Sequence, residues 1–277
     1  MLGKLFKNEW ISTWKVPTAL CIYLAALTIL GCVSFLSPFW GINSSIIEII
    51  AAFSVLIYVL SIFSICIAST IYFIVRFYRN MYTDEGYLMH TLPVKSWQHV
   101  TAKGLTFLIW SILIGLAVVS SILTLATTAT LSLSQITIAD LKMLGFDFQS
   151  LMALFQSNVG ISFLQAVLML IALLLVQAIS GILIVYASVS IGQLFTKHRV
   201  LASFLAYACI NMVLQFITSL VQIPSLLARS ELFQSSSGVL ANLLDPAYFS
   251  SLIQALVLSV AAFITTCYIM NRKLNLE

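Results

Sequence analysis

The feature that most constrains this chain is a series of six long apolar stretches in which Glu48 is the one charged residue. They occupy residues 16–37, 46–75, 104–130, 159–190, 200–223 and 247–270. A helix needs about 20 predominantly apolar residues to cross the hydrocarbon core of a bilayer. Each stretch is therefore long enough to form one transmembrane helix.

Composition excludes a water-soluble fold, because 61% of the residues are hydrophobic and only 8% are charged. A membrane-spanning chain must satisfy its backbone polar groups internally, which leaves helices and closed barrels. The stretches are unbroken, whereas barrel strands alternate apolar and polar residues. We therefore predict an all-α polytopic membrane protein with six transmembrane helices, forming a single transmembrane domain over residues 1–277.

The distribution of basic residues predicts the orientation. Of the 13 Lys and Arg residues, only Lys142 and Arg229 fall on one side of the predicted spans. Cytoplasmic loops carry the excess of Lys and Arg in membrane proteins. Both termini and residues 76–103 are thus predicted to be cytoplasmic, and segments 131–158 and 224–246 to be extracellular.

Residues 1–15 have the pattern of an amphipathic helix that lies on the inner leaflet. Their apolar residues recur at helical spacing, and three lysines fall on the other side. The apolar set is Leu2, Leu5, Phe6, Trp10 and Trp14. A simple extension of the first span is the alternative, which the lysines and Pro17 disfavour.

Residues 76–103 form the most polar segment of the chain. Thr83 is a suitable N-cap, acidic residues follow it, and Leu92-Pro93 would end the short helix that they begin. Ser96 is expected to cap a second helix that continues into the third span. The apolar and aromatic residues of this elbow favour either a protein partner, since such side chains are enriched at interface cores, or a loop folded onto the headgroups.

The segment Asp84-Glu-Gly-Tyr-Leu-Met-His-Thr-Leu-Pro-Val94, between the second and third spans, closely resembles the coupling loop of ABC exporter permeases of the ABC type-two class found in Gram-positive bacteria. The resemblance implies a multi-pass subunit of the bacterial plasma membrane. It also implies two partners, a second permease copy in a homodimer or heterodimer and a separate ABC ATPase that holds ATP and Mg. The implied docking residues are Asp84, Glu85, Gly86, Tyr87, Leu88 and Met89.

No G-x-x-x-x-G-K-[ST] sequence occurs in the chain, so ATP hydrolysis is expected in the separate subunit. We predict no enzyme activity, no cofactor and no nucleic-acid partner for this chain. Its three histidines, His90, His99 and His198, are too far apart in the sequence to indicate a metal site.

Neutral polar residues recur on two of the predicted spans. In the fifth span Asn211, Gln215, Thr218 and Gln222 repeat every three or four residues, and the second span contains Ser54, Tyr58 and Ser61. Two interpretations are open for both groups. They line a translocation pathway between dimerised permeases, or they form helix-to-helix hydrogen bonds of roughly 0.6 to 2 kcal/mol each.

Three functional hypotheses follow. An exporter permease agrees with the loop and with the lack of a nucleotide site. Its expected cargo is an amphipathic toxin or bacteriocin peptide, and export of a lipid, a drug or an ion is the alternative. A stand-alone secondary carrier or channel is the second, although an ion-coupled carrier usually places acids near the midplane of its spans. A membrane protein for peptide sensing or immunity is the third.

Overall fold

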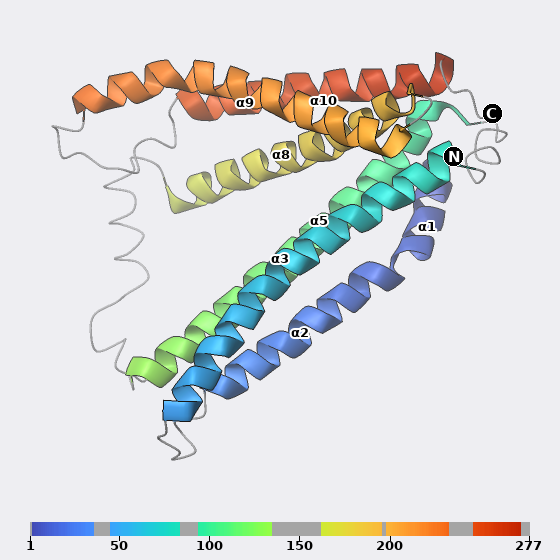
Figure 1. Cartoon of the computed structure of the whole chain (residues 1–277). Coiled ribbons are helices and arrows are strands. Elements are labelled where there is room, and N and C mark those ends of the chain that lie inside the picture. The colour runs from blue at the N-terminus through green and yellow to red at the C-terminus, as the bar shows by residue number, and fades with distance from the viewer. Residues whose placement is uncertain are drawn as a thin grey trace. The chain divides into compact units, whose positions relative to one another are not determined.

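The computed structural model describes residues 2–35, 45–83, 94–134, 162–195, 198–232 and 246–272, and within these ranges its regular secondary structure is entirely α-helical. Every helix except α1 is long and apolar enough to cross a membrane, which gives six spans. The protein is thus an all-α polytopic membrane protein, as predicted. The helices are α1 (Leu2–Thr13), α2 (Lys15–Phe35), α3 (Ser45–Tyr82), α5 (Ser96–Ser134), α8 (Phe163–Gly192), α9 (Arg199–Leu232) and α10 (Pro246–Arg272) (Figure 1).

The chain forms two compact units. The first contains Met1–Arg76 and Leu105–Phe146, and the second contains Phe77–Gly104 and Asp147–Glu277. Two helices therefore contribute to both units, since the last residues of α3 and the first residues of α5 belong to the second. The single transmembrane domain over the whole chain stays a prediction.

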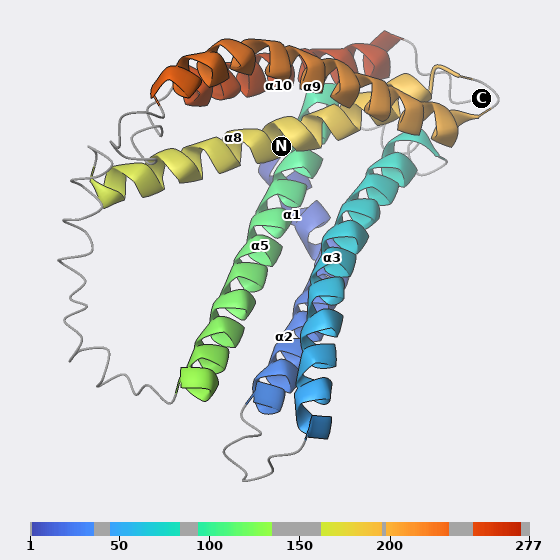
Figure 2. The same cartoon turned by 60° about the vertical axis from the view of Figure 1, so that its left-hand side comes forward.

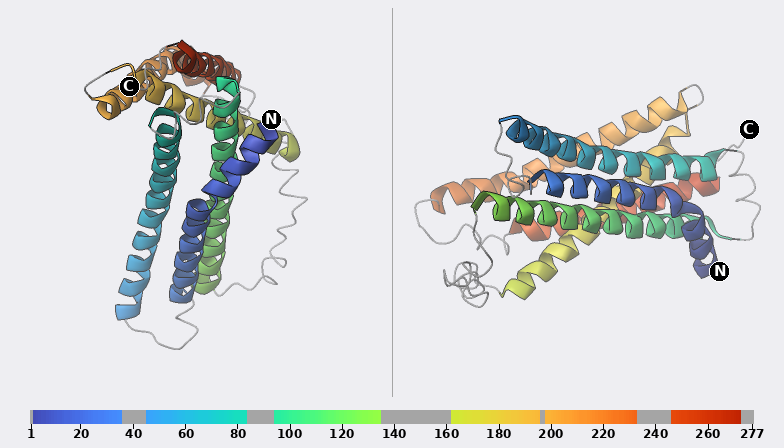
Figure 3. Two further views of the ribbon diagram at one scale, coloured as in Figure 1. Left: turned by 90° about the vertical axis from the view of Figure 1, so that its right-hand side faces the viewer. Right: turned by 90° about the horizontal axis from the view of Figure 1, so that it is seen from below.

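The first unit is built on α2, α3 and α5, which extend alongside one another (Figure 3). Its core contains Leu24 from α2, Ile65 from α3 and Leu125 from α5, all buried. At Gly31 the two helices α2 and α5 come close, because an added Cβ would lie 3.2 Å from a methyl carbon of Leu125. The chain bends between α1 and α2, where Trp14 separates two helices (Figure 1).

The second unit places α8 against both α9 and α10 (Figure 2). Ile184 and Ala187 of α8 pack with Ala262 of α10. The end of α8 approaches α9 so closely that a Cβ at Gly192 would lie 2.6 Å from the backbone N and Cα of Ser203. Real Cβ atoms essentially never come that near, so only glycine fits at this junction.

Large apolar side chains cover the outer surface of both units. Val200, Met212 and Ile22 are 72%, 76% and 71% exposed. A soluble monomer rarely exposes contiguous apolar surface on this scale. The surface is instead that of helices whose outer faces contact lipid.

The helix limits differ from the predicted spans where charged or polar residues continue a helix beyond its apolar part. Helix α3 extends past residue 75 to Tyr82, and α9 continues through Pro224 to Leu232, into the predicted extracellular segment. Helix α8 begins at Phe163 because Ser162 and Gln165 form a capping box. The predicted helix that would begin near Asp84 lies outside the described residues.

Candidate functional site

The two ends of the loop between α3 and α5, which is predicted to be cytoplasmic, are attached within the second unit. We call the six residues involved the loop anchor. It consists of Phe77, Tyr82, Ser96, Tyr186, Ser190 and Asn271.

On the N-terminal side of the loop, Tyr82 is the last residue of α3. Its hydroxyl shares a 2.6 Å hydrogen bond with Oγ of Ser190 on α8. Both side chains are buried. An unpaired hydroxyl in that setting would be costly, so this bond fixes the end of α3 on α8.

One turn earlier, Phe77 stacks on Tyr186 with ring centroids 3.8 Å apart and an interplanar angle of 8°. Tyr186 is only 2% exposed. Gly104 of α5 lies beside the same ring, since a Cβ added at Gly104 would be 3.8 Å from Cε2 of Tyr186. A stacked aromatic pair contributes about 0.5–1.5 kcal/mol of stability beyond the gain from the surface that it buries. Helix α8 therefore holds the last turn of α3 through two adjacent contacts, at Phe77 and at Tyr82.

On the C-terminal side of the loop, Ser96 Oγ donates a 2.5 Å hydrogen bond to Oδ1 of Asn271 on α10. Ser96 is the first residue of α5, one position inside the helix from the cap position that is predicted for it. His99 and Lys103, in the next two turns, are buried and both have interaction partners. The loop anchor therefore joins one side of the loop to α8 and the other to α10.

The predicted docking residues themselves, Asp84, Glu85, Gly86, Tyr87, Leu88 and Met89, lie outside the described residues. Their role in docking stays a prediction.

Helix α1 is attached to α3 in the first unit. Arg76 Nη2 lies 3.3 Å from Glu9 Oε2 and donates a 2.7 Å hydrogen bond to Oγ of Ser12. Trp10 stacks on Trp110 of α5, with centroids 4.7 Å apart. The sequence did not predict a role for Glu9, which is buried. The lysines of α1, Lys4 and Lys7, are exposed, as the amphipathic pattern predicts.

The polar residues of the second span lie within the first unit. The Tyr58 hydroxyl shares a 2.7 Å hydrogen bond with Ser121 Oγ of α5, and Ser61 Oγ donates to the Tyr58 carbonyl at 2.6 Å. Tyr58 and Ser61 are buried, whereas Ser54 is half-buried and also has a partner. At Tyr58 a helix-to-helix bond is thus in place.

The stripe on α9 divides into two parts in the second unit. Thr218 accepts a 2.7 Å hydrogen bond from Nε2 of Gln254 on α10, which joins the two helices. Asn211 and Gln215 are exposed, and the Asn211 amide donates to the carbonyl of Tyr207 in its own helix. The Gln222 side chain lies outside the described part of the chain. The exposed amides remain candidates for a pathway lining.

No protein-family model, no curated protein and no solved structure matches the chain. Within the described ranges, no three His, Cys, Asp or Glu side chains gather where they could hold a metal ion.

Proposed function

We propose that this chain is the transmembrane permease subunit of an ATP-driven exporter of the bacterial plasma membrane. It works as a dimer and couples to a separate ABC ATPase through residues 84–89. The loop anchor is the observation that carries the proposal, because it joins both ends of the loop to helices of one compact unit.

The contacts of the loop anchor provide a path for a force that acts on the loop. A force on the loop is carried along α3 to Tyr82 and Phe77, and these residues bear on Ser190 and Tyr186 of α8. The same force reaches α10 through Ser96 and Asn271. An ATPase that closes on ATP would thus move α8 and α10 together with the ends of α3 and α5.

The energy source must be a partner, since the full sequence contains no phosphate-binding G-x-x-x-x-G-K-[ST] motif. ATP and Mg would be held by that partner. The cargo in this proposal is an amphipathic peptide, which suits a dimer-lined path of apolar surface with exposed amides such as Asn211 and Gln215.

The docking prediction is tested by reversing charge and polarity in the loop. We expect Glu85→Arg and Leu88→Asp to abolish co-purification of an ABC ATPase from the native host, because each places a disruptive group at a protein interface core. Asp147→Arg is the matched control, since it makes the same type of change in the predicted extracellular segment. The amount of ATPase per permease is measured by mass spectrometry after extraction in mild detergent.

Recovery of the ATPase with wild type and the control, but not with the loop variants, supports the proposal. Wild-type protein that carries no ATPase at matched recovery would overturn it. In that case, transport that persists in vesicles without any ATPase favours a stand-alone carrier or channel. Peptide binding without nucleotide-dependent release favours a sensor or immunity protein.

A further inference from the structure

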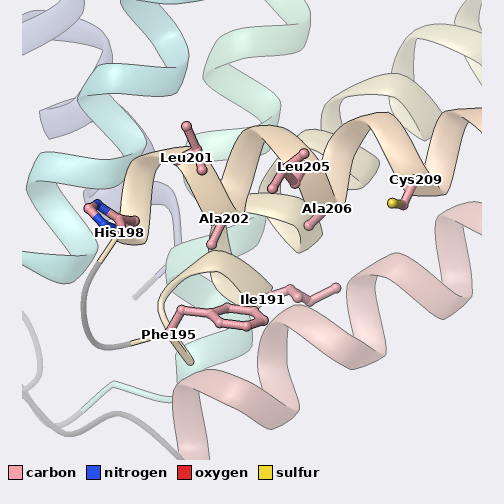
Figure 4. A pocket seen from close by; sticks show the side chains of 8 residues that line it. All are labelled: Ile191, Phe195, His198, Leu201, Ala202, Leu205, Ala206 and Cys209. Carbon is pink, nitrogen blue, oxygen red and sulfur yellow. The ribbon is translucent and has the colours of Figure 1, made fainter.

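An apolar groove of about 550 Å³ lies between the end of α8 and the beginning of α9 in the second unit. Its volume is within the roughly 300–1,000 Å³ typical of small-molecule sites. Eight residues line it, and all of them are apolar except His198 and Cys209. The lining residues are Ile191, Phe195, His198, Leu201, Ala202, Leu205, Ala206 and Cys209 (Figure 4).

The groove exists because α9 presents small side chains opposite Ile191 at the end of α8 and Phe195 just after that helix. Ala202 and Ala206 are four residues apart and therefore share one face of α9. Figure 4 shows them on the side of α9 toward Phe195 and Ile191. Leu201 and Leu205 form the adjoining wall. A groove with this lining does not suit ordered water, which needs polar partners.

The groove has the length of one bilayer leaflet. Its lining on α9 runs from His198, just before the first residue of the span, to Cys209. At 1.5 Å per residue this distance is about 16 Å. Half of a hydrocarbon core of about 30 Å is nearly the same depth. A soluble protein docked at the membrane surface would not reach so far, whereas an acyl chain would.

A cation follows directly after the residue at one end of the groove. His198 lines that end and is exposed, and Arg199, which is outside the lining, is the first residue of α9 and has a partly exposed side chain. The N-terminus of a helix also carries a partial positive charge that favours an anion. Basic pockets between transmembrane helices on the cytoplasmic side are suited to anionic headgroups.

We propose that this groove binds one acyl chain of an anionic phospholipid, with the lipid phosphate beside His198 and Arg199. The site is independent of the exporter proposal, because it involves neither the ATPase nor a cargo. It provides the second unit with a binding site for negatively charged membrane lipid.

The test counts phospholipid bound to the full-length protein by native mass spectrometry in detergent. Dioleoyl phosphatidylglycerol is the anionic probe, and dioleoyl phosphatidylcholine is the zwitterionic one. Ala206→Trp fills the groove, and Ala208→Trp is the matched control, because Ala208 is exposed on the same helix outside the lining. We expect wild type and Ala208→Trp to retain phosphatidylglycerol in preference to phosphatidylcholine, and Ala206→Trp to lose this bound lipid.

Arg199→Gln tests the headgroup separately from the groove. Removing one cation near a membrane surface should weaken phosphatidylglycerol binding by about fivefold and leave phosphatidylcholine binding unchanged. Equal phosphatidylglycerol retention by wild type and Ala206→Trp would overturn the proposal. An Ala206→Trp variant that keeps its lipid but changes oligomeric state or loses a co-purified protein would instead make the groove a protein interface. Circular dichroism of each variant separates loss of lipid from loss of fold.

Discussion

At the scale of single residues, hydroxyl side chains in the spans satisfy their hydrogen bonds mainly within their own helix. Thr28 donates to the carbonyl of Ala25, Ser188 to that of Val185 and Thr266 to that of Ala262. Such bonds to the preceding turn are a common arrangement for Ser and Thr in helices. A hydroxyl that bonds to another helix, as Tyr58 does, is therefore informative about packing.

Tyr58→Phe should destabilise the first unit, because it removes the 2.7 Å bond to Ser121 and leaves that hydroxyl without its cross-helix partner. Such a bond within a membrane contributes about 0.6 to 1.7 kcal/mol. The measurement is the unfolding free energy in mixed micelles. Tyr23→Phe is the control, since Tyr23 is half-exposed on α2.

A double-mutant cycle with Ser121→Ala isolates this bond from other effects of the two substitutions. The double variant should be destabilised by less than the sum of the single variants. Additive costs would mean that the bond contributes nothing measurable, and the pathway interpretation of Tyr58 would then gain weight.

At the scale of elements, α1 is attached by charge as well as by aromatic stacking. The Glu9 side chain is 9% exposed and that of Arg76 is 20% exposed, so their ion pair is partly shielded from water. Removing one partner from such a pair leaves the other carboxylate or guanidinium poorly compensated. The position of α1 relative to α3 therefore depends on both residues.

Arg76→Glu should release α1, because it places two carboxylates where an ion pair now lies at 3.3 Å. A hydrogen bond to a charged group contributes about 1.5–3 kcal/mol to stability, and this contribution is lost in the variant. Chymotrypsin cleavage after Phe6, Trp10 or Trp14 should accelerate about tenfold or more in detergent, as followed by mass spectrometry.

Adding Glu9→Arg to Arg76→Glu restores opposite charges and should return cleavage to nearly the wild-type rate. This swap leaves the chymotrypsin sites unchanged, so the comparison is direct. Unaltered cleavage of Arg76→Glu would indicate that the stacking of Trp10 on Trp110 holds α1 without the ion pair.

The spans could be predicted from the sequence because the length of an apolar run is a local property. The capping box at Ser162 and Gln165 is also local, and its Ser-x-x-Gln pattern would have placed the start of α8 correctly. Glu9 could not be assigned, since an acid in an amphipathic helix ordinarily faces water. Its burial depends on Arg76, which is 67 residues away.

The loop anchor was beyond sequence reasoning for the same physical reason. Tyr82 and Ser190 are separated by 108 residues, and nothing in either neighbourhood marks this serine among the others of α8. Which serine of α8 bonds to Tyr82 is decided by how the end of α3 packs on α8. The sequence predicted that the loop matters, and the structure shows where the described residues at its two ends are attached.

At the scale of the whole molecule, the asymmetry of charge decides whether the proposed function is feasible at all. Eleven of the 13 Lys and Arg residues, all but Lys142 and Arg229, fall on the side of the two termini and the loop. Only a cytoplasmic loop can meet an ATPase that uses cytoplasmic ATP. The exporter proposal therefore requires the orientation that the positive-inside rule predicts.

Cysteine labelling tests this orientation directly. In a background in which all five native cysteines are replaced, Lys142→Cys and Lys95→Cys provide one probe on each predicted face and remove the same charge. A membrane-impermeant maleimide applied to sealed right-side-out vesicles should label the Lys142→Cys variant at once. It should label the Lys95→Cys variant only after permeabilisation, because an excess of cytoplasmic Lys and Arg fixes the loop inside. The opposite pattern would place the loop away from ATP and overturn the exporter proposal, while the lipid site between α8 and α9 would remain to be judged on its own binding data.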